Sequence, residues 1–175
     1  MTCIVGKVYE DGTVMLGADS IGVSGYDYTV RKDQKLFRVG EFIIGCAGCY
    51  RTLQLVQYRL QPTVIPEDMD LHEYMVVHFV EELRKVLKDG GIAEVDRNVE
   101  QGGWFLVGIR DRLFQIQSDY QVKETALGMD AIGCGQAYAL GAMYAEATLP
   151  TALEIAAEFS CGVKGPFHFL TTESV

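Results

Sequence analysis

The sequence contains no long hydrophobic run. A membrane-spanning helix needs about 20 consecutive apolar residues, and none of the apolar segments of this chain approaches that length. A charged start followed by an apolar core, which marks a secretory signal peptide, is also missing. We therefore expect a soluble, cytoplasmic protein.

Positive charge is scarce. The 15 lysine and arginine residues are outnumbered by 24 aspartates and glutamates, and the formal net charge is -9. Nucleic acids and anionic membranes are themselves negatively charged and repel such a surface. We expect neither nucleic acid nor membrane as a partner.

The cysteines form no recognisable site, and a phosphate-binding motif is missing. The five cysteines are odd in number and lie in apolar or glycine-rich surroundings, as buried free thiols do in a reducing compartment. Cys46 and Cys49 form a C-x-x-C pair without a second pair or a nearby histidine, which disfavours a zinc or redox site. No G-x-x-x-x-G-K-[ST] motif is present. We expect no metal and no cofactor, and any ATP-dependent step must come from another chain.

The composition is that of an ordered globular protein. The chain has 175 residues, of which 49% are hydrophobic and 22% are charged. This length fits one domain with a substantial core. We find no internal repeat, linker or low-complexity segment, and we expect a single domain over residues 1–175.

The first part of the chain has the character of β-hairpins. Asp11-Gly12 joins two short apolar runs, and this dipeptide between β-rich segments is a strong hairpin signal. A second pair of strands flanks Gly40-Glu41, and residues 20–33 are expected to form a loop with at most an edge strand over 26–30. The expected strands cover residues 2–8, 13–17, 35–39 and 42–46. Local hairpins of this kind indicate a largely antiparallel sheet.

Helices and further strands alternate in the remaining sequence. Apolar residues recur at helical spacing over 49–60 and 70–88, and proline or glycine follows each segment. Residues 92–103 are polar and acidic and are expected to form a surface loop. The later elements are strands over 104–109 and 113–117 extended by 120–122, helices over 133–147 and 150–161, and a closing strand over 167–170. This order predicts an α+β fold in which two stacked sheets lie between helical layers.

Thr2 is the most notable candidate for chemistry. If Met1 is removed, which the small Thr2 side chain permits, Thr2 carries a free α-amine beside its own hydroxyl. A hydroxyl needs an adjacent base to take its proton as it attacks. An α-amine has a reference pKa of about 8 and can serve as that base near neutral pH.

Several segments resemble the proteasome β-subunits and the bacterial HslV peptidase. The matching segments are the N-terminal Thr2, Gly17-Ala18-Asp19, Lys35-Leu36-Phe37, residues 44–48 (IGCAG), residues 132–139 (IGCGQAYA) and Phe167-His168-Phe169. They occur in the order of that family and span nearly the whole chain. The resemblance implies an N-terminal-nucleophile αββα sandwich that assembles into stacked rings with the active sites inside.

The resemblance also implies roles for individual residues. Thr2 is implied as the nucleophile, and Lys35 as the cation that lowers nearby pKa values and stabilises negative charge on the attacked carbonyl. Asp19 is implied to pair with Lys35 and keep it charged. The backbone N–H of Gly45 is implied as an oxyanion donor.

The chain departs from the family at other matching positions. Cys134 stands where the family has a serine, and Glu158 and Cys161 stand where an aspartate and a serine support the amine. A thiol is a weaker hydrogen-bond donor than a hydroxyl, so the proton relay is expected to be slower or to use water. Ile43, Ala47 and Arg51 match in position the residues of the first specificity pocket.

Three functions follow as hypotheses. The leading one is a threonine endopeptidase, active after Met1 removal, that cleaves peptides or unfolded proteins inside a homo-oligomeric ring and receives substrate from a separate AAA+ unfoldase. The second is a catalytically silent, ring-forming scaffold, because a retained Met1 makes the Thr2 nitrogen an amide that cannot act as base. The third is a small-amide hydrolase on the same fold.

Overall fold

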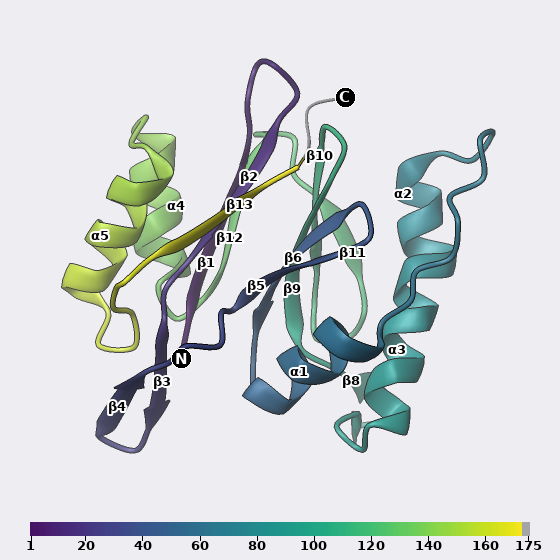
Figure 1. The fold of residues 1–175 in the computed structure, drawn as a ribbon, viewed down its shortest axis with the longest axis horizontal. Helices are drawn as coiled ribbons and strands as arrows, with labels where there is room; N and C mark the ends of the chain where they lie inside the picture. The colour runs from purple at the N-terminus through teal and green to yellow at the C-terminus, as the bar shows by residue number, and fades with distance from the viewer. Residues whose placement is uncertain (173–175) are drawn as a thin grey trace.

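The computed structural model describes residues 1–172 and arranges them in four layers. Two antiparallel sheets lie face to face, and a pair of helices covers the outer face of one sheet while a longer helical segment covers the outer face of the other (Figure 1). The α+β, αββα architecture expected from the sequence is therefore confirmed. No helix within residues 1–172 is long and apolar enough to cross a membrane.

The first sheet has the strand order β12-β1-β2-β13 and the second has the order β11-β10-β9-β6-β5. The strands of the first sheet are β1 (Cys3–Val8), β2 (Val14–Ala18), β12 (Met129–Gly133) and β13 (His168–Thr171). Those of the second are β5 (Leu36–Val39), β6 (Phe42–Ala47), β9 (Trp104–Ile109), β10 (Arg112–Ile116) and β11 (Val122–Glu124). All the pairings are antiparallel.

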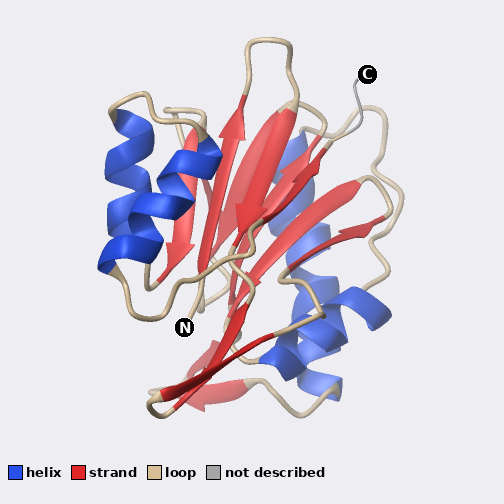
Figure 2. Ribbon diagram, turned by 60° about the vertical axis from the view of Figure 1, so that its left-hand side comes forward, coloured by secondary structure: helices blue, strands red, loops and turns tan. Residues whose placement is uncertain are grey.

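The helices pack on the outer faces of the sheets (Figure 2). The helices α4 (Gln136–Tyr144) and α5 (Leu149–Phe159) cover the first sheet, and α1 (Tyr50–Arg59) and α3 (Val80–Asp89) lie on the second. Helix α3 continues α2 (Leu71–Tyr74) through a π-helical turn, η1 (Met75–Phe79). Asp70 caps this segment, because its carboxylate accepts hydrogen bonds from the backbone N–H groups of His72 and Glu73.

Two small hairpins and one strand go beyond the sequence expectation, which included only an edge strand over 26–30 in these regions. Residues 20–33 hold a complete hairpin, β3 (Ile21–Ser24) and β4 (Asp27–Val30), and residues 92–103 hold β7 (Glu94–Asp96) and β8 (Val99–Gln101). Their strands are only 3 or 4 residues long and mostly exposed, so they have little apolar alternation to detect. Strand β12 was missed because the glycines that follow it were interpreted only as a helix start.

Apolar side chains fill the space between each pair of layers. Between the sheets lie Ile4, Leu16, Ile43 and Leu106, all essentially without exposed surface. Separate clusters lie between the first sheet and α4 and α5, and between the second sheet and α1 and α3. This packing fixes the ends of β1, β2 and β6 relative to one another.

Candidate active site

The start of β1 and the end of β2 bring Thr2 and Asp19 to the same edge of the first sheet. The antiparallel register pairs Ile4 with Ala18, so the residue before β1 and the residue after β2 lie beside each other. Both side chains are buried, with 4% of Thr2 and 0% of Asp19 exposed. Two residues that are 17 positions apart in the sequence are thus brought together by one hairpin.

Lys35 and Asp19 form a buried ion pair. The ammonium nitrogen of Lys35 lies 2.8 Å and 2.9 Å from the two carboxylate oxygens of Asp19. The same carboxylate accepts hydrogen bonds from the backbone N–H groups of Cys3, at 2.8 Å, and Ile21, at 3.3 Å. These bonds hold the carboxylate in place, and the carboxylate in turn fixes the ammonium at the end of the first sheet.

The Lys35 ammonium also reaches the carbonyl group of Met1, directly before the residue that carries the hydroxyl. It donates a hydrogen bond to the carbonyl oxygen of Met1 at 3.3 Å, and the Thr2 hydroxyl donates to the same oxygen at 2.6 Å. The hydroxyl and the cation therefore converge on one carbonyl group. Such an arrangement can stabilise negative charge on an oxygen close to the hydroxyl.

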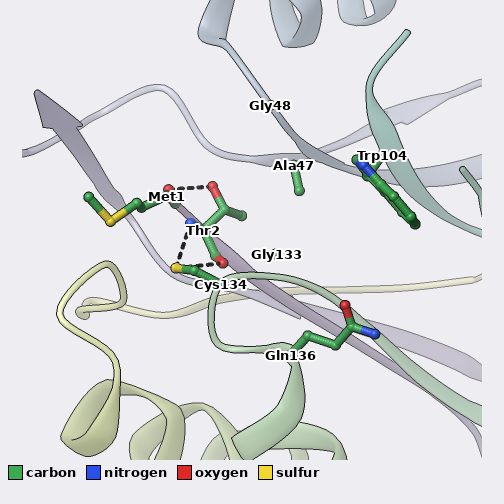
Figure 3. Close-up of a pocket in the computed structure, with 8 residues that line it drawn as sticks. All are labelled: Met1, Thr2, Ala47, Gly48, Trp104, Gly133, Cys134 and Gln136. Atoms are coloured by element: carbon green, nitrogen blue, oxygen red, sulfur yellow. Dashed lines mark hydrogen bonds between the residues drawn. The ribbon is translucent and has the colours of Figure 1, made fainter. Parts of the chain in front are cut away.

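Cys134 lies against the backbone of Thr2. The Thr2 N–H donates to the Cys134 Sγ at 3.4 Å, and the thiol lies 3.4 Å from the Thr2 carbonyl oxygen, to which it can donate (Figure 3). The Ser160 hydroxyl lies 3.5 Å from the same sulfur. Cys134 therefore lies between the Thr2 nitrogen and a neighbouring hydroxyl.

Ser160, to which the sequence reasoning gave no role, contacts the sulfur of Cys134. It follows the last residue of α5 and lies at the C-terminal cap of this helix. The resemblance directed attention to Glu158 and Cys161 on either side of it. The only sequence signal for Ser160 is a hydroxyl residue at a predicted helix end, and such residues are common.

An open pocket of about 450 Å³ lies beside Thr2. Trp104, at the start of β9, and Gln136, at the start of α4, lie on the wall away from Thr2 (Figure 3). The pocket is lined by Met1, Thr2, Ala47, Gly48, Trp104, Gly133, Cys134 and Gln136. Sequence reasoning gave no role to Trp104, Gly48 or Gln136, because only the tertiary fold brings these loops and strand ends together.

Gly133 allows the close approach of two strand ends. Its φ is 94°, and a Cβ at this position would lie 2.1 Å from the Thr2 carbonyl oxygen. Only glycine fits here without moving the Thr2 backbone.

Gly45 does not lie in the pocket, which corrects the expectation that it supplies an oxyanion donor. It lies inside β6, between β5 and β9, and a Cβ there would meet the Ile4 and Leu36 side chains in the core. Gly48, just beyond the end of β6, lines the pocket instead, and a Cβ there would meet open space.

The other candidates divide between the pocket and the rest of the molecule. Ala47 lines the pocket, whereas Ile43 is buried between the sheets and Arg51 is exposed on α1. Glu158 and Cys161 do not line it either. Both are exposed and line a separate hollow beside α5 and the β3–β4 hairpin. Within residues 1–172, no group of three or more His, Cys, Asp or Glu side chains is placed to hold a metal ion.

Solved structures of other proteins share this fold. The BPH protein of Thiobacillus denitrificans matches with a TM-score of 0.79 and 23% identity, over 98% of both chains. The same protein in complex with Epoxomicin matches with a TM-score of 0.78 and 22% identity, over 98% of this chain and 99% of that chain. Eukaryotic HslV from Trypanosoma brucei matches with a TM-score of 0.66 and 19% identity, over 97% of this chain and 98% of that chain.

Sequence comparison alone does not place the chain. No family model and no curated protein matches it. The structural matches nevertheless cover nearly the full length of both partners, which confirms the resemblance to proteasome-like proteins at the level of the fold. The chain therefore has the fold of BPH and HslV.

Proposed function

We propose that this protein is a threonine endopeptidase of the proteasome and HslV type, with Thr2 as its nucleophile after removal of Met1. The observation that carries the proposal is the buried Lys35 ammonium, which Asp19 holds in place and which lines a small hollow together with Thr2. A hydroxyl beside a fixed cation, at the end of a strand that borders an open pocket, suits nucleophilic attack on an amide.

In this mechanism the Thr2 amine takes the proton of the Thr2 hydroxyl as the oxygen attacks a peptide carbonyl. While Met1 is attached, the Thr2 nitrogen is an amide and cannot act as base. Removal of Met1 converts it to an amine beside the Cys134 sulfur, which is 3.4 Å from that nitrogen. The amine then returns the proton to the leaving amine, and water releases the acyl group by the reverse sequence.

The groups around Thr2 have distinct roles in this mechanism. Lys35 stabilises the developing negative charge and is itself held by Asp19. Gly48, at the rim of the pocket, replaces Gly45 as the proposed backbone donor to the oxyanion. Cys134 and Ser160 form the proposed relay to the amine.

The substrate and partners follow from the same proposal. We propose peptides or unfolded proteins as substrates, a ring of identical chains as the assembled form, and a separate AAA+ unfoldase as the source of any ATP-driven step. The fold that the chain shares with BPH and HslV supports this assignment. The solved complex of T. denitrificans BPH with Epoxomicin supplies a probe.

The proposal is tested first on the N-terminus. Intact mass is measured for the purified protein before and after incubation with Epoxomicin. A chain that starts at Thr2 and gains the mass of the compound supports the proposal. The Thr2→Ala variant is expected to gain no mass, to lose peptide hydrolysis by at least about 10³-fold, and to keep its assembled size by light scattering.

The same experiment addresses the alternative functions. A chain that keeps Met1, ignores Epoxomicin and still assembles would support the silent scaffold. A monomer that cleaves small amides but not peptides would support the small-amide hydrolase. Equal peptide hydrolysis by the Thr2→Ala variant would contradict the proposed role of Thr2.

A further inference from the structure

A second, much smaller hollow also borders Thr2. It holds about 10 Å³, which is room for about one water molecule. Thr2 and Gly48 line both hollows. The small one is completed by Lys35, Cys46, Cys49, Tyr50 and Leu53.

The Tyr50 ring is part of the wall of this small hollow and is held from behind. The Arg31 guanidinium lies 3.6 Å from the centre of the ring, a distance at which a cation is attracted to an aromatic face. Arg31 is itself fixed by Asp33, to which its Nε and Nη2 donate at 2.8 Å and 2.6 Å. The ring is thus clamped by a charged pair and is not free to swing outward.

Gly22 makes room for this stack. A Cβ at Gly22 would lie 2.8 Å from the Arg31 side chain and 3.2 Å from the Tyr50 ring. The β3–β4 hairpin therefore carries Arg31 to the ring, although its own side chains are mostly exposed. The clamp is built from three separate parts of the chain: the hairpin, the loop that follows it and the start of α1.

The Tyr50 hydroxyl has no hydrogen-bond partner among the described residues although the atom is buried. Burial raises the pKa of Tyr50 to about 12, so this phenol is neutral at physiological pH. With this neutral aromatic ring in its wall, a hollow of this size has no space for a large side chain.

We infer that Tyr50, clamped by Arg31 and Asp33, restricts the protein to substrates with a small side chain on the residue whose carbonyl is attacked. The inference rests on the proposed peptidase function. When the attacked carbonyl lies at the Thr2 hydroxyl, the substrate backbone occupies the open pocket, and one side chain turns past Gly48 into the small hollow. Glycine or alanine fits there, whereas leucine or phenylalanine collides with the Tyr50 ring.

The test compares short peptides that differ only at this residue and carry a fluorogenic amine as leaving group. For the wild type we expect kcat/KM for alanine to exceed that for phenylalanine by about tenfold or more, a ratio within the reach of a shaped pocket. Tyr50→Ala is expected to reverse the preference, and Tyr50→Phe to keep it. Tyr58→Ala removes an exposed tyrosine of the same helix and is expected to keep the wild-type preference.

Binding to the Thr2→Ala variant separates this inference from the proposed function. Fluorescence anisotropy with the same peptides is expected to give tighter binding for alanine than for phenylalanine, and Tyr50→Ala in this background is expected to remove the difference. If the peptides bind selectively but the wild-type protein does not hydrolyse them, the result would contradict the peptidase assignment and support the steric role of Tyr50. Equal use of alanine and phenylalanine by the wild type, in hydrolysis and in binding, would overturn the inference.

Discussion

The Lys35 ammonium lies 2.8 Å and 2.9 Å from the two Asp19 carboxylate oxygens, and neither side chain has more than 3% of its surface exposed. Asp19 also accepts hydrogen bonds from the backbone N–H groups of Cys3 and Ile21. A charge pair that is almost fully buried is costly to break, because the remaining partner keeps its charge without compensation. The pair therefore couples the candidate site to the stability of the fold.

The first prediction concerns the loss of this pair. Asp19→Asn is expected to lower the free energy of unfolding by about 3–5 kcal/mol, because it leaves Lys35 buried and unpaired. Glu81→Gln is the matched control, since Glu81 pairs with Arg84 on the surface, and it is expected to cost at most about 1 kcal/mol. Urea denaturation followed by circular dichroism measures both, and equal costs would contradict the prediction.

The second prediction concerns Gly133. Gly133→Ala is expected to destabilise the protein by about 1–3 kcal/mol through backbone strain alone. The clash of the new Cβ with the Thr2 carbonyl adds to this cost. Gly141→Ala, within α4, meets no atom within 4 Å and is expected to stabilise by about 0.5–1 kcal/mol. A lower melting temperature for Gly133→Ala and a higher one for Gly141→Ala, each relative to the wild type, would support this account. An unchanged melting temperature for Gly133→Ala would contradict it.

The third prediction concerns the thiol beside Thr2. Cys134→Ser replaces a weak donor with a hydroxyl that is a better hydrogen-bond partner for the Thr2 amine. If the gain is about 1 kcal/mol, kcat/KM for peptide hydrolysis rises about fivefold. Cys161→Ser, outside the pocket, is expected to change kcat/KM by less than about twofold. A Cys134→Ser variant that is slower than the wild type would exclude this view of the relay.

The fourth prediction concerns the pH dependence of thiol labelling. Burial acts to raise the pKa of the Cys49 thiol, but hydrogen bonds from the Thr52 hydroxyl and N–H outweigh it, so the pKa is lowered. Burial, followed by the Asp19 charge, raises the pKa of Cys3 to about 12. Since thiolate is the reactive form, iodoacetamide at neutral pH is expected to label Cys49 and to spare Cys3 until the protein unfolds.

Peptide mapping by mass spectrometry follows this labelling as the pH is raised. A lowered pKa means that the Cys49 thiolate forms at a lower pH than an ordinary thiol, so its labelling reaches its maximum rate earlier. Thr52→Val removes the hydroxyl and is expected to shift that rise to higher pH. Labelling of Cys3 as fast as Cys49 in the folded protein would contradict the burial argument.

Much of the fold could be predicted from the sequence because its main elements carry local signals. The Asp11-Gly12 turn, the helical spacing after Cys49 and the Asp70 cap each depend on neighbouring residues, and the structure contains the expected hairpin and helices. The short hairpins at 21–30 and 94–101 and the strand β12 were missed. Their residues are few, and β12 is recognised only through its pairing with β1.

The candidate site was only partly predictable. A threonine after the initiator methionine, an aspartate at a strand end and a lysine before an apolar strand are readable in the sequence, and the structure brings Thr2, Asp19 and Lys35 together. Gly45, Glu158 and Cys161 were assigned by matching positions and do not line the pocket, whereas Gly48 lines it and Ser160 contacts the Cys134 sulfur. A shift of one to three residues moves a side chain to another face, and matching by position alone does not resolve it.

The sequence by itself determined the alternation of strands and helices and the chemical groups available at the N-terminus, because turns, caps and apolar periodicity act over a few residues. Only the tertiary structure decided which of those groups meet. The register of β1 against β2 and β12 places Asp19 and Cys134 beside Thr2. The stacking of the two sheets then buries Lys35 against Asp19. Such contacts join residues that are distant in the chain, and only the closely packed core between the layers fixes their separation.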